Sequence, residues 1–209
     1  MVPPIIRVET FAVRYPTVGR FKFFEDAQGR PIGRPTVVVK LTAEDGTVGW
    51  GQSVPTPRWS YETPETVKST IDNYLAPLLI GKNPFEVDAL HTAMNQAIAP
   101  SFSTGQPICK AGIDLALHDL CGRLQKKPVA AAWNREGRDR IRLSWTLNPR
   151  TLDDIERLVE EGRKAGYDTF NVKVAPDIKF DVEMCRIVKR LVPEGFLWAD
   201  ANGGYDTAT

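Results

Sequence analysis

Hydrophobic and polar positions follow two different periods along the chain, and the first is a period of two. Residues 5–14, 35–42 and 47–53 each alternate in this way, which is typical of β-strands with one covered face. The Asp45-Gly46 step between the last two segments supplies the backbone freedom of a tight hairpin turn. We therefore predict that the chain opens as an antiparallel meander of three strands.

From residue 62 onward, apolar positions recur at the helical spacing of three and four. Thr63 is suited to cap a first helix and Pro64 to occupy its first turn. Further helices are predicted over residues 83–98 and 107–124, followed by a short helical turn at 129–133. The side chains expected to face the core are Val67, Ile71, Tyr74, Leu75, Val87, Leu90, Met94, Ile98, Ile108, Ala111, Leu115, Ala116 and Leu120.

A polar stretch at residues 134–139 separates this part from a second pattern, so we predict one domain over 1–134 and another over 140–209. In the second domain, strands alternate with helices, which is the pattern of parallel crossover units. The predicted strands are 141–147, 169–174 and 196–200, and the predicted helices are 152–165 and 181–191. A parallel sheet is normally covered on both faces or closed, and an eightfold barrel takes about 250 residues. We expect a barrel that is incomplete in this chain; a small open sheet is the alternative.

Polar residues at the ends of the second and third predicted parallel strands carry the candidate chemistry, because strand ends are where such folds place working side chains. Asn171 and Lys173 lie two apart and share one face of their strand. A lysine beside a metal ion has a lowered pKa and can act as a base. Asp200 and Asn202 offer oxygen atoms of the kind that Mg²⁺ prefers. The plain alternative is a solvated lysine and an aspartate that caps a turn.

Composition limits the classes of partner. The net charge is +1, with 42% hydrophobic and 25% charged residues, which predicts no strong attraction to nucleic acid or to an acidic membrane. The three cysteines are scattered, which favours reduced thiols in a cytoplasmic protein. We expect neither a secretory signal nor a membrane span. The two histidines, His91 and His118, are expected to be partly buried packing residues.

Four stretches, taken together, resemble the enolase superfamily in its mandelate racemase and muconate lactonizing enzyme branch. Val-Gly-Trp-Gly-Gln at 48–52 is similar to the family's Gly-x-Gly-Glu, and residues 111–120 are similar to its third cap helix, often A-I-D-x-A-L-W-D-L. Asn-Val-Lys at 171–173 stands in the place of Lys-x-Lys, and Asp-Ala-Asn at 200–202 matches Asp-x-Asn. The resemblance covers the entire chain.

The resemblance implies an α+β capping domain, residues 1–134, followed by an α/β (β/α)8 TIM-type barrel, of which residues 140–209 hold about three βα units. It implies Mg²⁺ as cofactor, with Asp200 as the first of three acidic ligands and Asn202 nearby. Lys173 becomes the acid or base at the α-carbon of a small carboxylate substrate. The shared step is removal of the proton α to the carboxylate, giving an enediolate that Mg²⁺ stabilises. We also expect a homo-oligomer.

Two loops of the capping domain, residues 15–24 and 55–61, would choose the substrate and exclude water in such an enzyme. The second holds prolines, an arginine and aromatic side chains, although a plain connector fits it equally well. The candidate substrate-binding residues in these loops are Tyr15, Arg20, Phe21, Arg58, Trp59 and Tyr61.

Asn171 departs from the family pattern, because it replaces the first lysine of Lys-x-Lys and carries no charge. This casts doubt on racemisation by two lysines and leaves Lys173 as the sole group on its side of the substrate. A second departure is Gln52 in place of glutamate. Three readings stay open: an isomerase, cycloisomerase or epimerase; an acid-sugar dehydratase; and a non-catalytic protein with an inherited fold.

Overall fold

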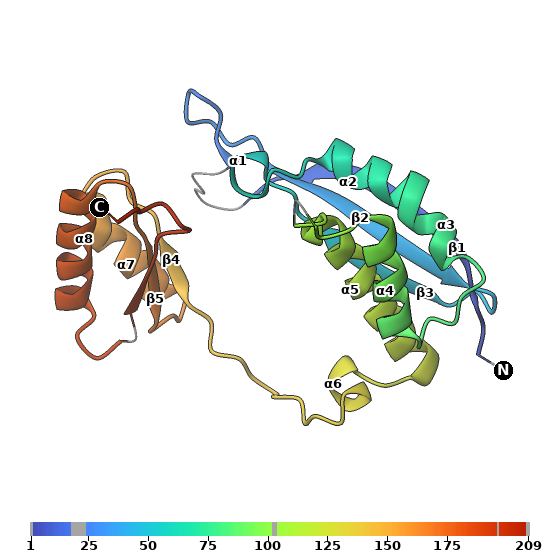
Figure 1. The fold of residues 1–209 in the computed structure, drawn as a ribbon. Helices are drawn as coiled ribbons and strands as arrows, with labels where there is room; N and C mark the ends of the chain where they lie inside the picture. The colour runs from blue at the N-terminus through green and yellow to red at the C-terminus, as the bar shows by residue number, and fades with distance from the viewer. Residues whose placement is uncertain (1, 18–23, 102–103, 196, 208–209) are drawn as a thin grey trace. The chain divides into compact units, whose positions relative to one another are not determined.

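The computed structural model describes residues 2–17, 24–101, 104–195 and 197–207 (Figure 1). The chain divides into two compact units, Met1–Gly137 and Arg138–Thr209. Each unit has a hydrophobic core of its own. Among the described helices, none combines the length and apolar character that a membrane crossing requires.

The first unit opens with a three-stranded antiparallel sheet in the order β1-β2-β3. The strands are β1 (Ile5–Tyr15), β2 (Arg34–Ala43) and β3 (Val48–Ser53), as the alternating pattern predicts. Gly46, with a φ of 84°, closes the tight turn between β2 and β3, and the Thr47 amide donates to Asp45 Oδ1 at 2.9 Å. The predicted meander is confirmed.

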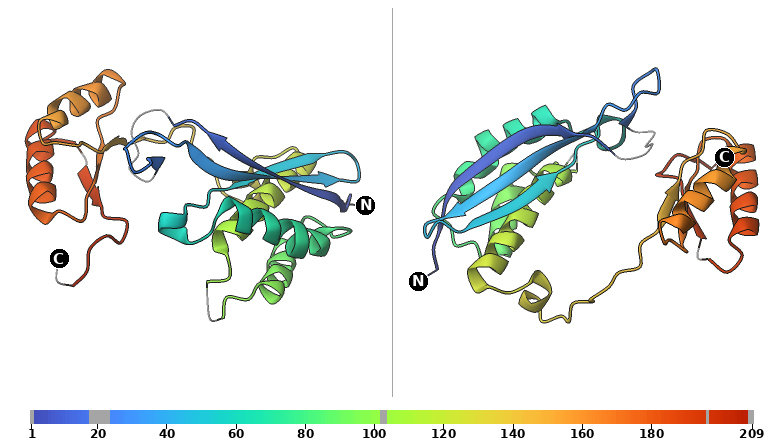
Figure 2. Two further views of the ribbon diagram at one scale, coloured as in Figure 1. Left: turned by 90° about the horizontal axis from the view of Figure 1, so that it is seen from above. Right: turned by 180° about the vertical axis from the view of Figure 1, so that it is seen from behind.

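Helical segments of the first unit lie against one face of this sheet (Figure 2). The helical segments of this unit are α1 (Pro57–Ser60), α2 (Pro64–Thr70), the π-helical turn η2 (Ile71–Leu75), α3 (Ala76–Leu79), α4 (Val87–Ala97), α5 (Pro107–Gln125) and α6 (Val129–Ala132). Of these, α2, η2, α3 and α5 make the main contacts with the strands, and α6 packs against α5. The core between sheet and helices includes Val37, Val39 and Leu41 from β2, with Ile113, Leu117 and Leu120 from α5. The segment at residues 55–61, expected to be a loop, contains the helical turn α1.

The sheet and α5 approach each other closely because two glycines face each other. A Cβ atom added to Gly51 of β3 would lie 2.0 Å from the carbonyl oxygen of Gly112 and 2.5 Å from the amide nitrogen of Ala116. Beside this contact, the amide of Trp50 donates to Asp119 Oδ2 at 2.8 Å. The carboxylate of α5 thus satisfies a backbone donor at the outer edge of the sheet.

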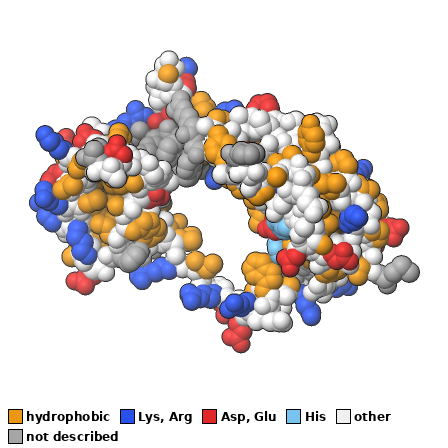
Figure 3. Space-filling view, viewed as in Figure 1, with side chains coloured by type: hydrophobic (Ala, Val, Ile, Leu, Met, Phe, Trp, Pro, Cys, Tyr) orange, Lys and Arg blue, Asp and Glu red, His pale blue; other side chains and the backbone are white. Residues whose placement is uncertain are grey.

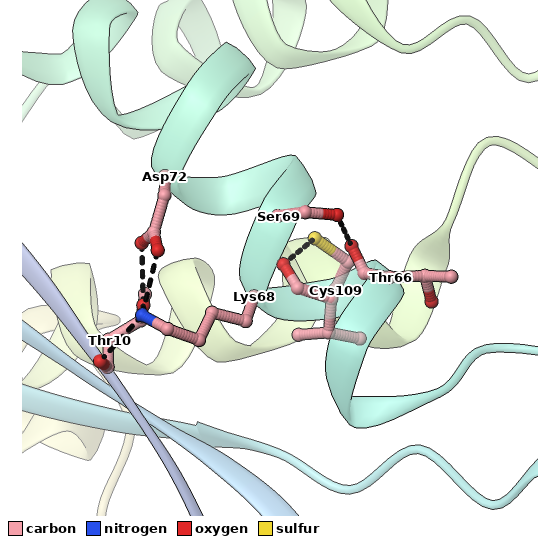
Figure 4. Close-up of polar contacts among 7 residues, drawn as sticks. Thr10, Thr66, Lys68, Ser69, Asp72 and Cys109 are labelled. Carbon is pink, nitrogen blue, oxygen red and sulfur yellow. Dashed lines mark hydrogen bonds and ion pairs between the residues drawn. The ribbon is translucent and has the colours of Figure 1, made fainter.

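Polar contacts fix α2 and η2 to β1 (Figure 4). Lys68 Nζ donates to the Thr10 hydroxyl at 2.8 Å and forms an ion pair with Asp72 at 2.7 Å. The helix begins with Thr63, whose side chain accepts from the Thr66 amide while the Thr66 hydroxyl accepts from the Thr63 amide. The predicted cap at Thr63 is confirmed.

Three side chains that the helical pattern placed in the core are exposed. Tyr74 is 60% exposed, because the wider π-helical turn η2 directs Ile71 and Leu75 inward and Tyr74 outward. On α5, the glycine contact with β3 fixes the rotation of the helix, so that Ala111 and Leu115 face away from the sheet. The inward prediction for these three residues was wrong.

The second unit is a three-stranded parallel sheet in the order β4-β5-β6. Its elements are β4 (Trp145–Leu147), α7 (Asp154–Lys164), β5 (Phe170–Lys173), α8 (Ile178–Leu191) and β6 (Leu197–Asp200). Phe170 and Val172 are fully buried in its core, together with Met184 of α8. The three strands form an open sheet, which is the start of a barrel rather than a closed one.

The first parallel strand is shorter than the predicted 141–147. Ile141 and Leu143 are 76% and 62% exposed, and β4 starts at Trp145. Because β5 begins at Phe170, which pairs with Trp145, the residues before Trp145 have no described strand beside them.

Candidate functional site

Lys173 and Asp200 end two neighbouring strands and meet side by side. They are directly opposite each other in the parallel pairing of β5 with β6. Lys173 Nζ donates to Asp200 Oδ2, and it also donates to Asn202 Oδ1 at 3.2 Å. The structure therefore brings together three of the four strand-end residues that the sequence singled out.

Burial explains why this pair forms. The Lys173 side chain is 10% exposed and that of Asp200 is 32% exposed. A nearly buried ammonium group is costly unless an opposite charge and hydrogen-bond acceptors surround it. Asn202 completes the arrangement: its φ of 48° turns the chain back, and its amide donates to Asp200 Oδ1 at 3.0 Å. Asparagine adopts this left-handed conformation more readily than most residues.

Asn171 lies on the same face of β5 as Lys173, because the strand alternates and its neighbours Phe170 and Val172 point into the core. It is opposite Thr146 of β4 and Trp198 of β6. Asn171 is 5% exposed, and its Oδ1 is buried without a hydrogen-bond partner among the described residues. A buried acceptor of this kind is uncommon in native proteins and indicates a site for a ligand or water.

Asp181, in the first turn of α8, connects the loops that follow β5 and β6. Its Oδ2 accepts from the Ala175 amide at 2.6 Å and from the Tyr205 hydroxyl. The hydrogen bond from the hydroxyl to this carboxylate raises the pKa of Tyr205. The bridge holds the chain just beyond Lys173 and Asp200. Sequence reasoning missed it, although an aspartate in the first turn of the helix after a strand was a visible signal.

The donor atoms at this strand end are of the type that a hard cation takes. Asp200 offers a half-buried carboxylate, and Asn202 offers an amide oxygen beside it. Carboxylate and carbonyl oxygen atoms suit Mg²⁺, so the chemistry of the donors fits the ion. Within the described ranges, no group of three or more His, Cys, Asp or Glu side chains could hold a metal. Asp200 and Asn202 would thus be part of a metal site and not the whole of it.

The predicted substrate-binding residues belong to the first unit. Tyr15 is the last residue of β1. Tyr61 directly follows α1, is 62% exposed, and forms a hydrogen bond through its hydroxyl to Thr104. Arg20 and Phe21 lie outside the described residues, and for the other two, Arg58 and Trp59, the structure describes the backbone of α1 alone.

A half-enclosed cavity of about 270 Å³ lies beside residues 55–61, the second of the two loops predicted to contact substrate. Its lining includes Thr56 and Pro57 from the loop, with Arg14, Phe24 and Glu65. These residues were not among the sequence candidates, because the cavity forms where β1, β2 and α2 come together.

The two histidines reach the surface of the first unit beside acidic side chains (Figure 3). His91 Nε2 lies 2.7 Å from Asp114 Oδ1, and His118 Nε2 lies 3.5 Å from the same oxygen. The His118 ring also contacts Trp133 edge to face. Both histidines pack half-buried between helices, as predicted.

Comparison with known proteins matches this chain to one family of enzymes. The family model described as "Mandelate racemase / muconate lactonizing enzyme, N-terminal domain" matches residues 25–132. A chloromuconate cycloisomerase of Cupriavidus necator is 38% identical over 178 residues, covering 83% of this chain and 46% of the relative. An N-succinyl-L-Arg/Lys racemase of Bacillus cereus is 27% identical over 205 residues, covering 96% of this chain and 53% of the relative.

Solved structures agree in fold. The muconate lactonizing enzyme of Pseudomonas fluorescens, complexed with muconolactone, superimposes with a TM-score of 0.84 at 26% identity. The match covers 100% of this chain and 55% of that one. The chain spans about half the length of the curated relatives it matches.

Proposed function

The chain belongs to the mandelate racemase / muconate lactonizing enzyme family of the enolase superfamily, and from this premise we propose that the protein is an isomerase of small carboxylates. The reaction begins with removal of the proton α to the carboxylate. The observation that carries the proposal is the direct contact of Lys173 with Asp200 at the ends of β5 and β6.

Lys173 is the group that takes the proton, at Nζ, and it does so in its neutral amine form, because the ammonium form has no free electron pair. A proton α to a carboxylate is very weakly acidic, so its removal needs a positioned base and stabilisation of the negative charge that develops. The low exposure of Lys173 holds Nζ in one place and limits its contact with water. Asn171 carries no charge, so Lys173 is the single basic group that β5 presents on this face.

Asp200, with Asn202 nearby, would hold a Mg²⁺ ion. When bound, this ion supplies positive charge beside the substrate carboxylate and lowers the energy of the negative charge that forms there. The oxygen donors of the two residues support this assignment. The Asn202 amide, which donates to Asp200 Oδ1, orients the carboxylate.

Relatives favour an isomerase over the acid-sugar dehydratase that the sequence also allowed. Two of them are named as a chloromuconate cycloisomerase and an N-succinyl-L-Arg/Lys racemase. Both names describe isomerisation of a carboxylate compound. We therefore assign the same class of reaction to this protein.

Isothermal titration of the full-length protein with Mg²⁺ tests the metal assignment. We expect binding in the parent and a loss of roughly tenfold or more in affinity for Asp200→Ala, since a ligand to the ion is removed. Asp139→Ala is the matched control, because it deletes an exposed carboxylate at the boundary between the units. Absence of binding in the parent, or equal binding in Asp200→Ala, would support a non-catalytic protein with an inherited fold.

A further inference from the structure

We propose that Asn171 determines specificity, by accepting a hydrogen bond from an N–H or O–H group on a neutral part of the substrate. The inference rests on the proposed function and adds the class of compound. Its starting point is the buried Oδ1 of Asn171, which has no partner among the described residues although the side chain is 5% exposed. The amide lies on the same face of β5 as Lys173, two residues before it.

The face that carries Lys173 consists of two rows of different character. The row at the strand ends holds the charges, with Lys173 opposite Asp200. The row one step before it consists of Thr146, Asn171 and Trp198, which lie opposite one another in register. None of these three described side chains is charged. Rows of this kind are how neighbouring parallel strands present their inward residues.

The difference in charge between the two rows indicates which end of a substrate would lie at each row. Its carboxylate belongs at the charged row, where Lys173 and a cation on Asp200 stabilise negative charge. The group that reaches Asn171 meets a hydroxyl, an amide and an indole, and a second carboxylate there would find no cation in the row. It would also face an acceptor oxygen, which repels it. The row therefore favours a neutral group that donates a hydrogen bond and has apolar surface for Trp198.

Because leaving a buried acceptor unpaired costs free energy, Asn171 can discriminate between ligands that carry a hydrogen-bond donor and ligands that lack one. Asn171 Oδ1 is already removed from water, so a ligand donor that reaches it, once the side chains covering it move aside, gains a bond without displacing solvent from that atom. A ligand that fills the same space without a donor leaves the oxygen unpaired. The expected difference in affinity is between about five- and hundredfold. Two chemical classes that carry such a donor on the α-carbon are N-acylamino acids and 2-hydroxy acids.

Calorimetric titration of the full-length protein, in the presence of Mg²⁺, with matched ligand pairs tests the proposal. N-acetylleucine is compared with N-acetyl-N-methylleucine, and 2-hydroxy-4-methylpentanoate with its methyl ether; each pair differs in the donor. We expect at least one donor-bearing compound to bind roughly tenfold or more tightly than its partner. Which pair shows the preference distinguishes an N–H from an O–H donor. The dicarboxylate cis,cis-muconate is expected to bind more weakly than the preferred compound.

Variants of Asn171 connect the preference to this side chain. Asn171→Asp keeps an acceptor oxygen in the same place, so the ratio between the two members of the preferred pair should persist. Asn171→Leu removes the acceptor, so the ratio should fall to near one. Asn73→Leu is the control, because it makes the same change at an exposed position of η2 and should leave the ratio unaltered.

Several results would overturn the proposal: equal affinity within both pairs, no binding of any donor-bearing compound, tighter binding of muconate, or an unaltered ratio in Asn171→Leu. The proposed function fails separately. If the ratio behaves as expected but Lys173→Met still exchanges the α-proton at the parental rate, Asn171 recognises the ligand and the assigned base is wrong. If exchange depends on Lys173 but the ratios are all near one, the substrate class is wrong and the reaction stands.

Discussion

Cysteine side chains differ sharply in their surroundings, although all three are free thiols. Burial raises the pKa of Cys109 to about 12, with the Glu62 carboxylate adding to the effect, and raises that of Cys121 to about 11. Cys185 is less buried, and its pKa is raised by burial and by Asp181. The reactive species of a thiol is the thiolate, so these environments predict an order of reactivity.

At about pH 8, a thiol reagent should modify Cys185 first and leave Cys109 and Cys121 unmodified in the folded protein, since both remain protonated and covered. In concentrated guanidinium chloride all three should react. The pKa values of the thiols in the folded protein lie above the unfolded value of about 8.5. The contribution of the buried, protonated thiols to the free energy of unfolding is therefore complete below that pH and declines as the pH rises toward the folded values. Mass spectrometry after timed labelling checks the order, and modification of Cys109 as fast as Cys185 would contradict it.

The strand-end residues of the site were predictable one by one, because alternation along a strand decides which side chains share a face. That Lys173 and Asp200 lie directly opposite each other follows from the register in which β5 pairs with β6. The position of Asp181 in the first turn of a helix was visible in the sequence, but its bridge to Tyr205 depends on the path of two loops, which the hydrophobic period does not describe. The lack of a hydrogen-bond partner at Asn171 Oδ1 among the described residues could not be predicted from the sequence either, because the burial of this atom depends on the neighbouring strands.

Helix α5 packs directly against β3. This close approach requires glycine at positions 51 and 112, because a Cβ atom at either position would collide with the facing element. Gly51→Ala should lower the free energy of unfolding by about 3 kcal/mol or more, because the added methyl group meets backbone atoms that cannot rotate away. Gly137→Ala is the control: its added Cβ would lie 3.9 Å from its nearest neighbour. Urea denaturation followed by circular dichroism measures both, and similar stabilities for the two variants would show that the helix can move.

The type and order of the elements could be predicted from the hydrophobic period, but which side chains of each helix face the core could not be predicted in every case. The stripe through Val67, Ile71 and Leu75 was correct, but a single π-helical turn moved Tyr74 to the surface. A helical period of 3.6 assumes a regular helix, so an irregular turn defeats it. For the same reason, the glycine contact that rotates α5 could be recognised only after the sheet was known.

On the scale of the whole molecule, the division at residues 134–139 remains a proposal that proteolysis can test. Residues 131–143 are exposed, and no regular strand or helix is described between Ala132 and Trp145. Trypsin should therefore cleave first in this segment, at Arg135, Arg138 or Arg140, and leave the two cores intact. Intact-mass analysis of early products identifies the cut. First cleavage inside α5 or α8 would contradict two independently folded units.

The architecture of the whole was predictable from the change of period near residue 140, because alternating strands and helices produce a parallel sheet. The early residues of the first parallel strand were not, since Ile141 looks like a strand residue but has no described strand beside it. The family resemblance connected the two halves of the pattern, and the family model and relatives confirm it.

The central claim is that Lys173 removes the α-proton of a carboxylate in a reaction that needs the Asp200 site. Proton NMR in D₂O, with the full-length protein, Mg²⁺ and the carboxylate that binds most tightly, follows exchange of that proton directly. The parent and the control Lys164→Met, which changes an exposed lysine at the end of α7, should exchange it at equal rates. Lys173→Met should be slower by roughly a hundredfold or more, the usual contribution of a general base. Exchange in Lys173→Met at the parental rate would contradict the account.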